Sequence, residues 1–336
     1  MEVAITGQRM VQRRGGRPPV PVLCGLLIIA LRLWFPGGGQ ALPDLPAADE
    51  PAAIPLPAEE ALVAESAAIL PTAPPPQPIL PQQPVYVADI REYHSSGTVY
   101  FKNETDYLID IPSLLTGECP VTLGTEGVQV LIMHTHGTEA YTPSPAHPYT
   151  ASGEYRTTDS DANMLRVGRE MAAILNERGI STLHSTTLND YPAYNGSYNR
   201  ALKDIQQYVA EHPTIRLVID VHRDAIATGN TYYKTAAEVD GQPTAQLMFV
   251  TGTDAGGLSH PNWQDNLAFQ AGLHDRLNSR YPGIMRPMSI RASRFNQHIR
   301  AGSMLVEVGA CGNTLEEALA AARIFANTLA DLLLEQ

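Results

Sequence analysis

From residue 128 onward the chain alternates short apolar runs with longer segments of helical periodicity, and this alternation limits the fold more than any other feature. Apolar runs typical of buried strands lie at 128–134, 181–187, 215–225, 245–253 and 303–313. Apolar residues recur at helical spacing at 159–180, 200–212, 263–282 and 315–336. Strands that alternate with helices pair as a mainly parallel sheet with helices on both faces. We therefore predict a single α/β domain built on a mainly parallel, twisted sheet.

The first 89 residues have a different composition from the rest of the chain. Several arginines precede an apolar run at 20–35, an order typical of a signal anchor or a secretory signal. Pro, Ala and Gly dominate the next fifty residues, which cannot bury enough apolar surface to fold. We expect a cytoplasmic N-terminus at 1–17, a signal anchor at 18–35, a Pro/Ala-rich linker at 36–89 and the folded domain at 90–336. A cleaved signal peptide is the alternative, and both place the domain outside the cytoplasm.

Net charge and cysteine content exclude one function class and leave another question open. A formal charge of −12 over 336 residues argues against a basic surface for nucleic acid. Cys24 lies in the apolar run, so Cys119 and Cys311 remain as a possible disulfide pair in an oxidising compartment, or as two separate thiols.

Side chains that bind metals follow three of the predicted strands. His136 and Glu139 come after the first strand, His222 lies near the end of a later one, and Glu307 lies in the last. Ligands in α/β folds bind beyond the carboxyl ends of parallel strands. A catalytic zinc ion usually takes three protein ligands and keeps one position for water. We therefore predict a zinc site with His136, Glu139 and His222 as ligands and Glu307 as the base that activates the water.

Two of the predicted zinc ligands have alternatives. Alternation along an extended strand would put His134 on the same side as His136, so His134 is an alternative ligand or a residue that orients one. Asp159 and Asp161 are alternative carboxylates, although each also suits the cap of the following helix.

Arginines are candidates for stabilising the oxyanion or gripping a substrate carboxylate. Arg223 ranks first because it directly follows His222, and the others are Arg200, Arg286 and Arg291.

Eight segments in one order resemble the stage II sporulation protein P (SpoIIP) family, most specifically HTHGTEAY, YPGIMR and RFNQ. The resemblance implies a zinc N-acetylmuramoyl-L-alanine amidase that cleaves peptidoglycan, with an added endopeptidase activity on the stem peptide. It also implies an anchor in the mother-cell membrane that faces the forespore during engulfment. The implied partners are a lytic transglycosylase of the sporulation protein D (SpoIID) kind and other sporulation membrane proteins.

A more distant similarity is to the general zinc amidases of wall turnover. VIDVHRDA and LVEVGACGN match their later elements, with Ala310 in place of the usual aromatic residue, while the amidase glutamate falls near Asp159. We favour Glu139 and keep Asp159 as the alternative. The competing functions are a zinc endopeptidase that cuts only the stem peptide or cross-link, and an inactive scaffold that binds the wall.

Overall fold

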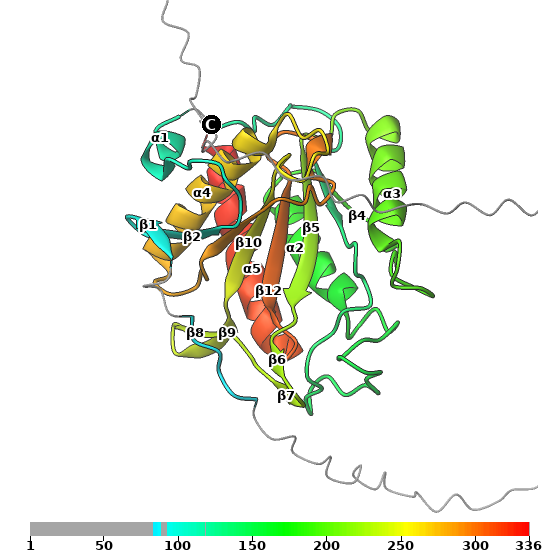
Figure 1. Cartoon of the computed structure of the whole chain (residues 1–336). Coiled ribbons are helices and arrows are strands. Elements are labelled where there is room, and N and C mark those ends of the chain that lie inside the picture. The colour runs from blue at the N-terminus through cyan, green and yellow to red at the C-terminus, as the bar shows by residue number, and fades with distance from the viewer. Residues whose placement is uncertain (1–82, 89–92, 118, 336) are drawn as a thin grey trace, which may run out of the picture. The chain divides into compact units, whose positions relative to one another are not determined.

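A mainly parallel sheet forms the centre of the protein (Figure 1). The computed structural model describes residues 83–88, 93–117 and 119–335. The main sheet within them contains β1 (His94–Ser96), β2 (Val99–Asn103), β3 (Val130–Met133), β4 (Thr182–His184), β5 (Leu217–Asp224), β10 (Leu247–Gly252), β11 (Met288–Arg291) and β12 (Met304–Ala310). Their order across the sheet is β1-β2-β11-β10-β12-β5-β3-β4. All neighbours are parallel except β1 with β2 and β10 with β12, which confirms the predicted α/β class.

Three long helices cover one face of this sheet, as Figure 1 shows. The α-helices are α1 (Ile111–Leu115), α2 (Met164–Glu177), α3 (Ser197–Glu211), α4 (Trp263–Arg280) and α5 (Leu315–Leu334), with a 3-10 helix, η2, at Gln297–Ile299. Alternate residues of the strands, such as Ile219 on β5 and Val306 on β12, join the main core with α2, α4 and α5. Full burial of one such side chain contributes about 1.5–3 kcal/mol to the free energy of unfolding.

The second face of the sheet divides into an apolar part and a polar part. Leu131 and Met133 of β3 and Val218 of β5 pack with Ala201 and Ile205 of α3 in a smaller core. The remaining alternate positions of β5 and β12, and those of β10, β11 and β2, carry polar side chains among apolar ones. We call this part, which includes His222, Glu307, Val250, Ser289 and Lys102, the site face.

Several elements were missed or misplaced by the sequence prediction. Strands β1, β2 and β11 are short and partly polar, as are the small hairpins, β6 (Ala227–Thr228) with β7 (Thr231–Tyr232) and β8 (Ala236–Val239) with β9 (Gln242–Ala245). Helix α2 begins after Asn163, whose side chain caps it, and not after an Asp or Ser. Tyr86, in the expected linker, donates a hydrogen bond to the carbonyl of Lys234.

The expected signal anchor at 18–35 lies outside the described residues, together with the basic N-terminus and most of the linker. Among the helices of the described ranges, none is long and apolar enough to cross a membrane.

Gly168 of α2 provides a test of how closely this helix packs on the sheet. A Cβ there would lie 2.5 Å from Nε2 of both His134 and His184. Because the two imidazoles are in contact and His134 is fully buried, they cannot both move away, so Gly168→Ala should lower the free energy of unfolding by about 1–3 kcal/mol, despite the better helix propensity of alanine. Gly272→Ala in α4 is the matched control, since its Cβ would meet nothing within 4 Å. Denaturant unfolding should show the first variant destabilised and the second unchanged or stabilised; equal effects would contradict this packing.

Candidate active site

The register between β5 and β12 brings two of the predicted site residues together. His222 of β5 is paired with Glu307 of β12, and the two strands are parallel. Neighbours in register on adjacent strands point to the same face of a sheet. Asp220, two residues before His222, lies on that face as well. The site therefore begins on the site face, in the C-terminal halves of β5 and β12 and just past the carboxyl end of β3.

Carboxylates surround His222. Its Nε2 lies 2.9 Å from Oδ1 of Asp220, and its Nδ1 lies 3.7 Å from Oε2 of Glu139. Burial opposes a charge on this imidazole, but Asp220, Glu139 and Glu307 outweigh burial and raise the pKa of His222 to about 10. The position strongly favours a positive charge, whether a proton or a cation.

The turn after β3 carries His136 and Glu139 to the same place. Oε1 of Glu139 lies 3.4 Å from Nη2 of Arg156, and its Oε2 accepts a hydrogen bond of 3.3 Å from the backbone N–H of Arg223. The His136 ring meets the His222 ring edge-on, with 5.3 Å between ring centroids. Two imidazoles and one carboxylate, from separate segments of the chain, thus face one another.

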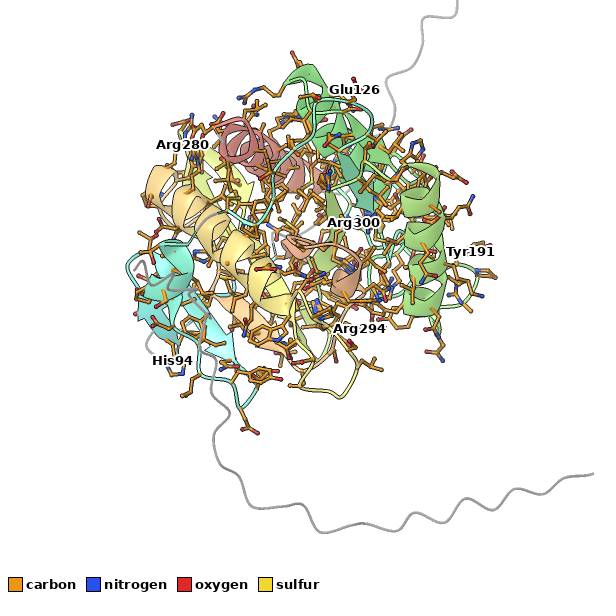
Figure 2. All side chains as sticks on the ribbon, turned by 90° about the horizontal axis from the view of Figure 1, so that it is seen from above. His94, Glu126, Tyr191, Arg280, Arg294 and Arg300 are labelled. Carbon is orange, nitrogen blue, oxygen red and sulfur yellow. The ribbon has the colours of Figure 1, made fainter. Side chains whose placement is uncertain are left out.

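Two tyrosines contact the His136 ring in addition to His222. The Tyr194 ring stacks on the His136 ring at 4.5 Å, and Tyr198 meets it edge-on at 5.6 Å. Arg156 lies over the outer face of Tyr194, 5.0 Å from its centroid. Figure 2 shows Tyr191, on the same loop, pointing outward beside α3. These contacts fix the plane of the His136 ring.

Glu307 is partly buried, and one of its carboxylate oxygens is buried and unsatisfied. No hydrogen-bond partner for its Oε2 is found in the described part of the chain. Burial raises the pKa of Glu307 to about 8, and His222 offsets only part of this shift. A carboxyl group with such a pKa can both accept and return a proton near neutral pH.

His136, Glu139 and His222 are the residues that could hold a metal ion. Nδ1 of His136 is buried and makes no hydrogen bond to any residue within the described ranges; the nearest carboxylate oxygen, of Asp190, is 3.9 Å away. Two imidazoles and a carboxylate are suitable donors for a catalytic zinc ion. In residues 83–88, 93–117 and 119–335, no group of three or more His, Cys, Asp or Glu is already arranged to hold a metal. The donor types therefore fit a metal, and their side chains would have to close on it.

His134 lies on the opposite side of the sheet from His136. It continues the alternation of Val130 and Ile132 toward α2, and the chain turns only after it. Its Nδ1 is 2.9 Å from the carbonyl of Val221, and its Nε2 is 2.8 Å from Nε2 of His184. Burial lowers the pKa of His134 to about 4. The expectation that the two histidines share one side was wrong, and the structure gives His134 a packing role.

Asp159 and Asp161, the alternative carboxylates, are exposed. Asp159 accepts a hydrogen bond from the backbone of Asp161, whose own carboxylate pairs with Arg169. Neither contacts His136 or His222 in any interaction among the described residues. Glu139 occupies the place for which Asp159 was the alternative.

Arg223 does not point toward the site. Because it directly follows His222 in β5, strand alternation turns it to the other face. Its guanidinium is buried and donates to the carbonyl oxygens of Ala140, Glu154 and Tyr155. The predicted role in stabilising an oxyanion is therefore replaced by a structural one, in which Arg223 holds the loop that carries Glu139.

The sequence interpretation missed the residues that orient the site. Asp220 accepts hydrogen bonds from the backbone N–H and the hydroxyl of Thr135, at 2.8 and 2.6 Å, as well as contacting His222. Asp190 likewise holds Thr138 and pairs with Arg156 at 2.9 Å. The signal for Asp220 was available: in a strand, an Asp two residues before a His shares its face. Asp190 and Arg156 lie in loops and offered no such signal.

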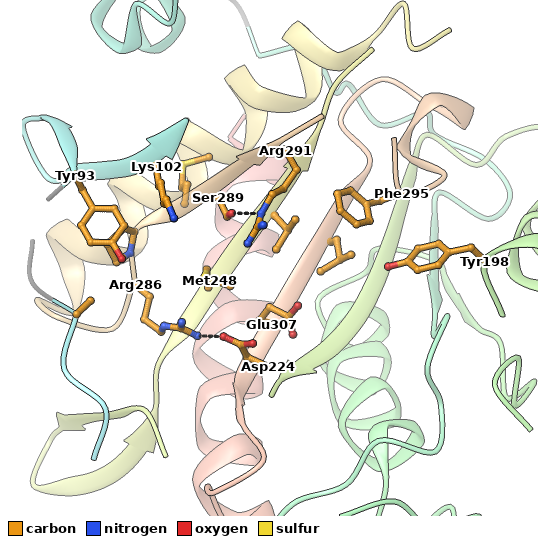
Figure 3. A pocket seen from close by; sticks show the side chains of 15 residues that line it. Tyr93, Lys102, Tyr198, Asp224, Met248, Arg286, Ser289, Arg291, Phe295 and Glu307 are labelled. Atoms are coloured by element: carbon orange, nitrogen blue, oxygen red, sulfur yellow. Dashed lines mark hydrogen bonds and ion pairs between the residues drawn. The ribbon is translucent and has the colours of Figure 1, made fainter. Parts of the chain in front are cut away.

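A pocket of about 380 Å³ opens beside Glu307 on the site face (Figure 3). Met248, Val250 and Leu305 are among its apolar lining residues, and Tyr198 and Phe295 lie together on one side of it. Lys102, Arg286 and Arg291 line the rest of the wall. The site residues therefore adjoin a cavity large enough for part of a substrate.

Comparisons with solved structures find N-acetylmuramoyl-L-alanine amidases. The amidase AmiC2 of Nostoc punctiforme is 18% identical, with a TM-score of 0.36 over 63% of this chain and 98% of its own. The catalytic domain of CwlV from Bacillus (Paenibacillus) polymyxa var. colistinus is 12% identical, with a TM-score of 0.37 over 62% and 97%. Neither similarity is strong enough to support an inference about this chain.

Sequence comparison is more specific. Stage II sporulation protein P of Bacillus subtilis (strain 168) is 27% identical over 240 residues, which cover 66% of this chain and 53% of that protein. The chain thus matches about half the length of this curated relative. The model of the stage II sporulation protein P (SpoIIP) family matches residues 90–330, which include all of the site residues described above. The chain belongs to the stage II sporulation protein P family.

Proposed function

We propose that this chain is a zinc-dependent peptidoglycan hydrolase that cleaves the amide bond between muramic acid and L-Ala. The observation that carries the proposal is the convergence of His136, Glu139 and His222 with Glu307, whose buried Oε2 has no hydrogen-bond partner among the described residues, beside a pocket. Membership of the sporulation family supports it independently.

His136, Glu139 and His222 would hold the metal. A bound zinc ion lowers the pKa of its water and polarises the substrate carbonyl. Asp220 lies 2.9 Å from Nε2 of His222, and Nδ1 of the same ring faces Glu139. The carboxylates around His222, which raise its pKa, stabilise a bound cation once the proton has left.

Glu307 performs the proton transfer. Water oxygen attacks the carbonyl carbon, and the carboxylate of Glu307 accepts the proton that the water loses. When the C–N bond breaks, Glu307 returns this proton to the leaving nitrogen, so that an amine and a carboxylic acid result. Burial suits it to this role because neither of its charge states is strongly favoured near neutral pH.

The proposed cellular setting is suggested by the family and by the N-terminal sequence. We propose that the segment at 18–35 tethers the enzyme to the mother-cell membrane, with the folded domain facing the forespore during engulfment. A lytic transglycosylase would supply the complementary cut in the glycan strand, since an amidase releases only peptides from it.

Digestion of purified peptidoglycan by the full-length protein in detergent, with zinc, tests this function. Mass spectrometry should reveal intact stem peptides together with glycan fragments whose muramic acid carries a free lactyl carboxyl group. A chelator should abolish the release, and added zinc should restore it. Shortened peptides with no free lactyl carboxyl would establish an endopeptidase instead, and no release under any condition would favour the scaffold.

A further inference from the structure

The pocket beside Glu307 extends across the sheet away from the residues that would hold the metal. Part of its lining comes from β12, β10, β11 and β2, which are successive neighbours in the sheet. Figure 3 shows Tyr198 and Phe295 on one side of the pocket and Tyr93 and Lys102 on the other, with Glu307 and Arg291 between them. Anything bound along it would start at the reacting bond and end near two cations.

We propose that this pocket binds the stem peptide of the substrate, and that Arg291 and Lys102 recognise a carboxylate of that peptide; this proposal rests on the proposed function. The peptide would be the leaving half of the cleaved amide. Its first residue would lie beside Glu307, and its acidic groups would lie over β11 and β2.

Charge is distributed unevenly along the pocket. Near Glu307, Arg286 pairs with Asp224 at 2.7 Å, so that this pair is neutral. At the far end, Lys102 and Arg291 share a single carboxylate, Glu104, at 3.1 and 2.7 Å. Two cations and one carboxylate leave one positive charge there, which attracts an anion of the ligand.

Arg291 is held in position to make such a contact. Its Nε donates to the hydroxyl of Ser289 at 2.7 Å, and its Nη1 donates to Glu104 at 2.7 Å. Nη2 has no hydrogen-bond partner among the described residues, and the side chain is 45% exposed. A guanidinium oriented by two bonds loses less entropy when it binds a carboxylate than a free one does.

The sheet geometry gives the length of peptide that reaches from one end to the other. Arg291 lies two strands away from Glu307 and four residues further along, because Glu307 pairs with Met248 and Arg291 pairs with Gly252. With strands about 4.8 Å apart and residues about 3.3 Å apart, the two backbones are roughly 16 Å from each other. The side chains of Arg291 and Glu307 shorten this gap, so about three extended residues fill it. In a stem peptide, free carboxylates are borne by the second and third residues, the D-glutamate and the diamino acid.

The end wall near Glu307 is held in a strained conformation. Phe295 and Asn296 have φ of 50° and 58°, a region that is costly for a bulky residue such as Phe295. Nδ2 of Asn296 donates to the carbonyl of Tyr198 at 2.8 Å, and the Phe295 and Tyr198 rings lie 5.9 Å apart. The strain is held in place by contacts to α3, which keeps the aromatic wall fixed where the first residue of the peptide would bind.

The test compares two peptides with the full-length protein. One is the tripeptide L-Ala-γ-D-Glu-meso-diaminopimelate, and the other is the same tripeptide with its free side carboxylates converted to amides. NMR titration should give a Kd about tenfold lower for the acidic tripeptide than for the amide. Arg291→Gln should remove most of this preference, and Lys102→Gln part of it, with little change in the Kd of the amide. Arg169→Gln is the matched control: Arg169 is 51% exposed and ion-paired, but lies on α2, behind the sheet.

Three outcomes would overturn the proposal. The unmodified protein could bind the two peptides with equal affinity, or Arg291→Gln could lose affinity for both peptides equally. The third is that Arg169→Gln loses the preference for the acidic tripeptide as Arg291→Gln does. Peptide binding requires no hydrolysis, so this test is independent of the proposed function. Hydrolysis without carboxylate preference would overturn the subsite alone. Carboxylate preference without hydrolysis would overturn the amidase proposal and leave an acidic-peptide site.

Discussion

Replacing Glu307 by glutamine should lower peptidoglycan hydrolysis by about 10³-fold while the protein keeps its fold and its zinc. The amide has the shape of the carboxyl group but cannot accept a proton from water, and general acid–base catalysis contributes about 10²–10⁴-fold. No bonding of Oε2 is lost, because that oxygen has no hydrogen-bond partner in the described residues. Burial of the carboxyl is itself unfavourable for its charge, so the variant should unfold at an equal or higher temperature.

The measurement is the initial rate of stem-peptide release, normalised to protein that retains one zinc per chain. Glu177→Gln is a matched control, since Glu177 is exposed at the end of α2, remote from β12. It should leave the rate unchanged. If Glu307→Gln retained full activity, the proton transfer would have to be assigned to another group. If it lost zinc, Glu307 would be a ligand.

The sequence predicted the elements that a large core requires. Runs such as 215–225 and 303–313 form strands with one face buried under helices. Their alternate residues are therefore apolar, and this pattern can be recognised in the sequence without knowing which strands pair with them. Strands β2 and β11 are inside the sheet next to the edge strand β1, carry Lys102, Ser289 and Arg291 on the site face, and lack such a run. Periodicity could not separate them from loops, although they line part of the pocket.

The errors within the site have a common physical origin, which is the face to which a side chain points. His222 and Glu307 were found because metal-type residues are conspicuous in apolar strands. Their contact depends on the register between β5 and β12, which is set by tertiary pairing and not by either strand alone. Arg223 was expected near His222 because it is adjacent in sequence, but adjacency in a strand means opposite faces.

The assignment of the metal ligands leads to the second large effect. His136→Gln should weaken zinc binding by more than about 100-fold and abolish hydrolysis, because one of the three proposed protein ligands is lost. His134→Gln should bind zinc as the unmodified protein does. It should lower the free energy of unfolding by about 1–3 kcal/mol instead, because the buried contacts with Val221 and His184 are broken.

Zinc competition with a chelator and denaturant unfolding, measured on both variants, separate the two histidines. The pair is closely matched: both side chains are buried, they lie two residues apart, and each is exchanged for the same amide. If both histidines had only a structural role, both variants would be less stable but would keep their zinc affinity, because the molecules that remain folded would still have the complete metal site. Loss of zinc in His134→Gln alone would reverse the assignment of the two histidines. Strand β3 would then have to extend past Met133 and turn the side chain of His134 toward His222. The turn after His134 is thus the feature that decides which imidazole reaches the metal.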